Sequence, residues 1–162
     1  MKIKVLMTIM AAVVIVSGIS SCGSDDDEQE AAVATQVAGS YKGNEVIMIM
    51  GEESSNDTKT YEFAKVSDTS VDMTIPESGE TGFMMIPKLM VKNIPLTKNG
   101  NTISGSVASY SGTVTNASGA EKAYTISNVA VVFSDKNVAV TFSLKYGTMP
   151  MTMETTFTGI RQ

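Results

Sequence analysis

The 162-residue sequence contains no histidine and no tryptophan, and its single cysteine is Cys22. The absence of histidine excludes Ser-His-Asp and Cys-His nucleophilic mechanisms, as well as histidine-ligated zinc or iron sites. Only 6% of the residues are aromatic, and no segment is continuously apolar over the roughly 20 residues that cross a bilayer as a helix. These absences favour a protein without catalytic activity, cofactor or metal, and they leave paired carboxylates as the remaining route to catalysis.

The first 21 residues have the three-part composition of an export signal. Lys2 and Lys4 precede the short apolar run 9–16, and small residues then lead to Cys22. This layout resembles a bacterial lipoprotein signal, in which Cys22 becomes the acylated first residue of the mature protein. We therefore predict a signal peptide over 1–21 and attachment to the membrane through a lipid on Cys22. A retained membrane anchor helix is the alternative.

Residues 22–38 are predicted to form a lipidated, flexible and acidic tether, within which 31–37 could form one helical turn. An acidic run follows the cysteine directly, and it consists of Ser24, Asp25, Asp26, Asp27 and Glu28. In gut-dwelling Gram-negative bacteria such a run resembles a signal for transfer to the outer face of the outer membrane. We therefore expect a surface-exposed outer membrane lipoprotein. A solvated linker on a periplasm-facing protein is the alternative.

The charge of the remaining chain argues against a nucleic-acid partner. The mature part carries a formal net charge of −7, but five of its acidic residues lie in the tether, so the body carries only about −2. Phosphate contacts require clustered Lys and Arg, and the body has no such cluster. We expect no binding to DNA or RNA.

From residue 39 onwards short apolar segments alternate with turn residues, which is typical of an all-β domain. The clearest strand is 137–146, where Val138, Val140 and Phe142 share one face with two further apolar residues. The strand before it is predicted over 124–133 and the one after it over 151–160, so that the three form a meander. Earlier strands are predicted over 40–50, 58–67, 69–75, 83–96 and 102–115, the last with a break near Ser109.

Eight or nine strands joined by successive hairpins are best satisfied by a closed antiparallel up-and-down barrel, because closure removes both unpaired edges. Asn99-Gly100 is a strong turn signal within this series. Pro87 and Pro95 cannot donate to a ladder, so their segment is predicted to be bulged or an edge. A β-sandwich is the alternative fold.

Two short motifs carry a resemblance to a known family. Val37-Ala38-Gly39-Ser40-Tyr41-Lys42-Gly43 opens the first strand, and Lys92-Asn93-Ile94-Pro95-Leu96 precedes a hairpin. Together with the lipoprotein signal, they resemble the calycin-like β-barrel lipoproteins of gut-dwelling Gram-negative bacteria over 37–160. The resemblance implies a lipocalin-like, eight-stranded barrel over 39–162, and it implies no established activity.

Carboxylates offer two candidate sites. Glu45 paired with Glu62 or Glu154 could form an acid/base system of the glycosidase type, but outward-facing charges are the favoured interpretation because isolated Glu is rarely buried. Glu52, Glu53 and Asp57 could hold a calcium ion, but a solvated hairpin tip is favoured there because loops concentrate polar residues.

Nine methionines follow Cys22, and three uses are open for them: core filling, an adaptable apolar pocket, or soft thioether ligands for Cu(I). Tyrosines at a barrel mouth could also stack on a sugar. We expect a non-catalytic barrel that binds a small apolar or amphipathic ligand; the alternative is a structural or interaction module that contacts a protein or glycan. The candidate pocket residues are Met151, Met153, Phe157, Phe142 and Tyr146.

Overall fold

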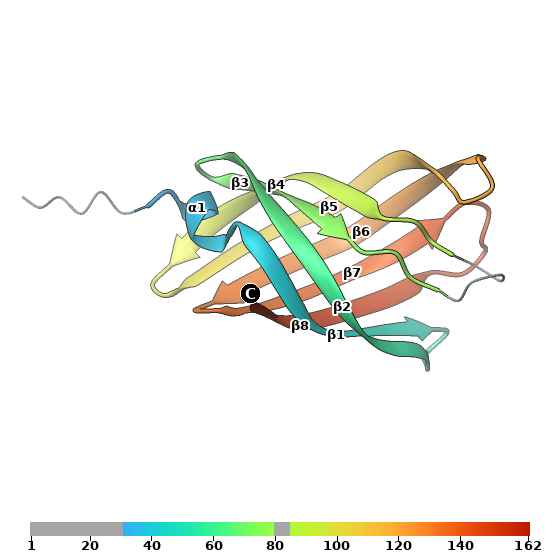
Figure 1. Cartoon of the computed structure of the whole chain (residues 1–162), viewed down its shortest axis with the longest axis horizontal. Helices are drawn as coiled ribbons and strands as arrows, with labels where there is room; N and C mark the ends of the chain where they lie inside the picture. Colours follow the sequence, from blue (N-terminus) through green and yellow to red (C-terminus); the bar gives the residue numbers. More distant parts are fainter. Residues whose placement is uncertain (1–30, 80–84) are drawn as a thin grey trace, which may run out of the picture. The chain divides into compact units, whose positions relative to one another are not determined.

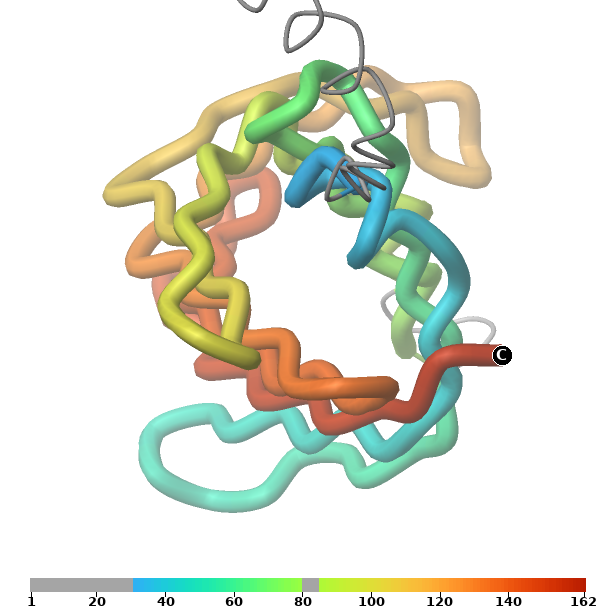
Figure 2. Tube along the Cα trace, turned by 90° about the vertical axis from the view of Figure 1, so that its left-hand side faces the viewer, coloured from blue at the N-terminus to red at the C-terminus, as the bar shows by residue number. Residues whose placement is uncertain are grey.

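A computed structural model describes residues 31–79 and 85–162, and in this part of the chain eight antiparallel strands close into a barrel in sequence order (Figures 1 and 2). The predicted up-and-down barrel is confirmed, and the β-sandwich alternative is wrong. The elements are α1 (Val33–Val37), β1 (Gly39–Ile49), β2 (Glu52–Ser67), β3 (Ser70–Ile75), β4 (Leu89–Asn99), β5 (Thr102–Thr115), β6 (Glu121–Ser134), β7 (Asn137–Tyr146) and β8 (Met153–Arg161).

Alternating burial along the strands shows which face packs inside the barrel. In β7 the apolar set Val138, Val140, Phe142, Leu144 and Tyr146 is buried, as the sequence pattern predicts. In β8 the buried positions alternate in the same way from Met153 to Gly159. Both strands pair as predicted in a meander with β6. The two-residue period of a strand therefore directs one apolar face into a common core.

Several strand boundaries differ from those predicted, including the start of β6 at Glu121, three residues earlier. β2 begins six residues earlier than predicted, because Met50 and Gly51 take positive φ angles of 55° and 85° and turn the chain at once. β4 begins at Leu89 instead of residue 83, and β8 begins two residues later than predicted. The predicted bulge is confirmed in β4, where Asn93 has a φ of 56° and its N–H donates to Asp72 Oδ1. The bulge lies at Asn93, before Pro95, and not at a proline itself.

The predicted helical turn is confirmed as α1, which lies across one end of the barrel and contacts β2, β3 and β4. Ala34 and Val37 are buried there. The Tyr41 hydroxyl donates to the Val37 carbonyl, and the Arg161 guanidinium donates to the Gln36 and Ala38 carbonyls. The compact unit thus begins at Ala32, earlier than the predicted domain start at residue 39. Within the described residues, no helix is long and apolar enough to cross a membrane.

Aromatic side chains fill the barrel next to α1. The rings of Tyr41, Phe63 and Phe133 lie with centroids 4.9–5.6 Å apart in edge-on and tilted contacts. Each of the three is at least 97% buried. Such aromatic pairs add about 0.5–1.5 kcal/mol each beyond the area they bury. Aromatic side chains therefore fill much of the lumen next to α1, where a pocket of about 320 Å³ remains beside Val37 and Phe133.

Candidate functional site

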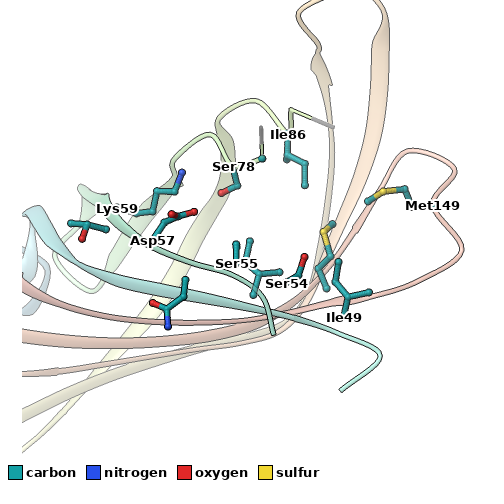
Figure 3. Close-up of a pocket in the computed structure, with 13 residues that line it drawn as sticks. Ile49, Ser54, Ser55, Asp57, Lys59, Ser78, Ile86 and Met149 are labelled. Atoms are coloured by element: carbon teal, nitrogen blue, oxygen red, sulfur yellow. The ribbon is translucent and has the colours of Figure 1, made fainter. Parts of the chain in front are cut away.

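The end of the barrel opposite α1 is open and carries a pocket of about 840 Å³ (Figure 3). Its walls come from β1, the first half of β2, the connections that follow β3 and β7, and the start of β8. These segments are distant in sequence, and closure of the barrel between β1 and β8 brings them together. We call this space the mouth pocket.

The strand register orders the mouth pocket by depth. β1 runs towards the mouth and β2 runs away from it, so the pairs Ile49↔Glu52, Ile47↔Ser55 and Glu45↔Asp57 lie successively deeper. At the rim, Ile49 pairs with Met153 on its other side, and Met149 lies close by in the lining. The rim layer is therefore apolar.

The deeper layer of the mouth pocket is polar. Its lining includes Asp57 and Lys59 on β2 and Ser78 after β3. Figure 3 shows Asp57 and Lys59 on the side of the pocket opposite to Ile49 and Met149. The mouth pocket is thus amphipathic: Ile49, Met149 and Met153 lie towards the rim with Ser54 beside them, and the charged groups Asp57 and Lys59 lie deeper, where Ile86 pairs with Ser78.

Glu45 lies beneath this polar layer and is only 1% exposed. The Tyr61 hydroxyl donates to Glu45 Oε2 at 2.5 Å, and the Ser78 hydroxyl donates to Oε1 at 3.0 Å. Burial, together with the neighbouring carboxylate, raises the pKa of Tyr61 well above its usual value, so this hydroxyl keeps its proton and remains a donor. The Tyr61 ring stacks on Phe157, with centroids 4.1 Å apart and planes inclined by 17°.

The buried position of Glu45 corrects the expectation that this carboxylate faces outward. Side chains of β1 alternate from Tyr41, so positions 43, 45 and 47 share its inward face. The sequence pattern does not reveal that Glu45 faces inward, because apolar residues occupy both faces of the strand from Val46 to Ile49. Two donated hydrogen bonds offset the cost of burying the carboxylate.

The segment after β3 is tied by hydrogen bonds to side chains of β1 and β2. Lys59 Nζ donates to the Glu77 carbonyl at 2.9 Å, and the adjacent Ser78 is held by Glu45. The backbones of Ser78 and Ile86 also exchange two hydrogen bonds. Ser78 and Ile86 are thereby fixed as part of the pocket wall.

The candidate pocket residues from the sequence occupy different places. Met153 lines the mouth pocket, whereas Phe142, Phe157 and Tyr146 are buried in the barrel interior and do not line it. Met151 is 39% exposed, outside the core. The Tyr146 hydroxyl is buried without a hydrogen-bond partner among the described residues.

The carboxylate pairs considered from the sequence do not assemble. Glu62 and Glu154 are exposed, whereas Glu45 is inside the barrel. Glu52, Glu53 and Asp57 are exposed in β2, and Glu52 directly follows the turn at Met50 and Gly51, so the predicted hairpin tip is confirmed next to this turn, whereas Asp57 lies within the strand. Across residues 31–79 and 85–162, no group of three or more Asp, Glu or Cys side chains could hold a metal ion.

The methionines fill the core at only two of the described positions, Met73 and Met153. Core filling is therefore the wrong interpretation for most of them. Met50 is 86% exposed and flanks a shallow hollow with Pro150 and Met151, beside the mouth pocket. We call these three residues the apolar tip. Cys22, the acidic run 24–28 and Met84 lie outside the described residues.

Several pocket residues escaped the sequence analysis, among them Ile47, Ile49 and Lys59. The inward parity of β1 and β2 is the signal that could have found them, since Tyr41 and Phe63 fix which alternate residues face the core. Ser78 follows β3 in a segment without any periodicity, so only the fold places it in the site.

Comparison with known proteins places the barrel among described families. Residues 37–160 match the calycin-like beta-barrel domain family. A crystal structure of a Bacteroides fragilis protein, named a "putative outer membrane protein", has a similar fold with a TM-score of 0.63 and 19% sequence identity. The match covers 81% of this chain and 53% of that protein, so this chain spans about half of its length. None of the curated proteins matches the sequence.

Proposed function

Because this chain belongs to the calycin-like β-barrel domain family, we propose that it is a non-catalytic lipoprotein of the cell envelope whose mouth pocket binds a small amphipathic ligand. The mouth pocket itself is the observation that carries the proposal. Eight-stranded barrels are wide enough for packed side chains or for one small ligand. Here side chains fill much of the end near α1, and about 840 Å³ stays open at the other end.

The lining of the mouth pocket supports an amphipathic ligand better than a purely apolar one. Ile47, Ile49 and Met153 offer apolar contact, while Asp57 and Ser78 offer an acceptor and a hydroxyl. A few placed polar groups in an otherwise apolar concavity are typical of small-molecule sites. Methionine side chains at the rim adapt to ligands of different shape.

The path of the chain places the predicted tether at the end of the barrel that lies away from the mouth pocket. The barrel unit begins at Ala32, next to α1 and therefore at the largely filled end. A lipid on Cys22 would hold that end within about 36 Å of the bilayer, because ten residues separate Cys22 from Ala32 and each extended residue spans at most about 3.6 Å. The tether thus joins the barrel at the end opposite to the mouth pocket.

An environment-sensitive apolar dye tests ligand binding directly. We expect diphenylhexatriene to bind the purified full chain in detergent-free buffer and to become fluorescent. Replacing Ile49 with asparagine places a polar amide in the apolar rim and should weaken binding about tenfold, since one buried aliphatic side chain contributes about 1.5–3 kcal/mol.

Val46→Asn is the matched control, because Val46 lies on the same strand and faces outward. It should leave the affinity unchanged. Absence of dye binding to the wild type, or equal weakening by both substitutions, would contradict the proposal.

The lipid anchor has its own test. Radiolabelled palmitate should be incorporated into the wild-type protein expressed in a Gram-negative host, and Cys22→Ser should abolish incorporation, because the anchor needs the thiol of the sole cysteine. Incorporation into the serine variant would contradict the assignment of the anchor, and so would an unlabelled wild type.

An interaction module at the cell surface is the second candidate function. It is favoured by the largely filled lumen next to α1 and by the apolar tip, which leaves Met50 86% exposed at a turn. No aromatic side chain among the described residues lines the mouth pocket, so sugar stacking there has no support from the geometry. The dye experiment separates the two candidates.

A further inference from the structure

We propose that the mouth pocket selects amphipathic ligands with a cationic head group and holds them with the head inward and the apolar part at the rim. The inference rests on the proposed function and deepens it. Its basis is the order of the pocket layers together with the charges that face them.

The layer order fixes the direction in which an amphiphile fits. Ile49 and Glu45 are four residues apart on β1, so the apolar rim and the polar floor are separated by about 13 Å along the strand. An apolar tail pushed inward would cover the Asp57 carboxylate without giving it a partner, which is costly, whereas the Ser78 hydroxyl already donates to Glu45. A cationic head group pushed inward would pair with the carboxylate and leave the tail against Ile49 and Met153.

The charges of the deep layer favour a cation. Glu45 and Asp57 are direct cross-strand partners on the inward face, a placement that brings their Cβ atoms to about 5 Å. Among the described residues Asp57 has no ion-pair partner, and its side chain is exposed to the pocket. An ammonium group beside Asp57 would supply the missing partner.

Lys59 is the one basic side chain in the lining, and its ammonium is already engaged. Its Nζ donates to the carbonyl of Glu77, the residue before Ser78. Glu52 and Glu53 add two further acidic groups on the same hairpin, close to the rim. An anionic head group would therefore meet more negative than positive charge on its way in.

The apolar part of such a ligand has a surface to continue on. Met149 and Met153 line the rim, and the apolar tip of Met50, Pro150 and Met151 extends outward beside it. A tail longer than the pocket could lie over this tip, where exposed methionine adapts to its shape. Contact with such a tail would explain why the Met50 side chain is exposed at this position and does not pack in the core.

Three probes with one fluorophore test the inference: diphenylhexatriene without a charge, with a trimethylammonium group, and with a propionate group. With the purified full chain we expect the cationic probe to bind at least fivefold more tightly than the anionic probe at low salt. Asp57→Asn should weaken binding of the cationic probe about fivefold, the effect expected of one solvent-accessible ion pair, and leave binding of the neutral probe unchanged.

Glu62→Gln is the matched control, since it removes one negative charge from the outward face of the same strand. It should leave all three affinities unchanged. If all three probes bind with equal affinity, or if the anionic probe binds most tightly, the inference is overturned while the proposed function stands. Equal effects of the two substitutions would also overturn it. If no probe binds, the proposed function itself fails.

Discussion

Replacing Glu45 with leucine is expected to lower the free energy of unfolding by about 3 kcal/mol, as measured by denaturant titration followed by circular dichroism. Leucine is close to glutamate in size, but it accepts no hydrogen bond. The hydroxyls of Tyr61 and Ser78 would then be left buried without their acceptor. Each unsatisfied buried donor costs about 1–3 kcal/mol.

Two substitutions control for this effect. Glu45→Gln keeps one acceptor oxygen for the Tyr61 hydroxyl, and the Ser78 hydroxyl can rotate to accept from the new amide NH2, so this substitution should cost only about 1 kcal/mol. Glu62→Leu changes an exposed glutamate on the outward face and should stay within about 0.5 kcal/mol of the wild type. A leucine at position 45 that left the stability unchanged would mean that the carboxylate is not held as described.

Gly43→Val is expected to destabilise the barrel by about 3 kcal/mol or more, because it wedges apart the seam where β1 pairs with β8. A Cβ atom at position 43 would lie 1.9 Å from the Thr158 carbonyl oxygen and 2.4 Å from the Gly159 Cα. Both atoms belong to the backbone, so no side-chain rotation relieves the contact. Overpacking of this kind forces backbone shifts that cost about 1–3 kcal/mol and sometimes more.

The neighbouring substitution Asn44→Val is the control for this seam, since Asn44 is exposed on the outer face of the same strand. Valine favours a strand, so the control should be neutral or slightly stabilising. Thermal unfolding of the two variants side by side gives the comparison. A shift for Gly43→Val no larger than that for Asn44→Val would show that the seam is looser than described.

The barrel could be predicted because several strands show which face points inward by the alternation of apolar and polar residues in their own sequence. β7 alternates strictly from Val138 to Tyr146, and Asn99-Gly100 marks the turn between β4 and β5. The second half of β1 could not be oriented by its own residues, since Val46, Ile47, Met48 and Ile49 are apolar on both faces, and only the parity set by Tyr41 indicates which of them face inward. Its face is set by pairing with β2 and β8, which are contacts the sequence does not display.

Most of the residues of the site could not be predicted from the sequence, for the same reason. Of the predicted pocket residues only Met153 lines the mouth pocket, because large apolar residues such as Phe157 are drawn into the core. Asp57 and Lys59 were assigned to a loop tip and the start of a strand, whereas the early turn at Gly51 extends β2 and directs them into the pocket. Placing Ser78 over Glu45 requires the complete barrel.

Native mass spectrometry of the protein purified from its own cell envelope tests the central claim most directly, namely that the mouth pocket holds a small amphipathic ligand. The account predicts that the wild type carries an additional small mass, that Val46→Asn retains it, and that Ile49→Asn loses it. A wild-type protein that shows only the mass of its own polypeptide and lipid, or an adduct that Ile49→Asn retains in full, would contradict the account.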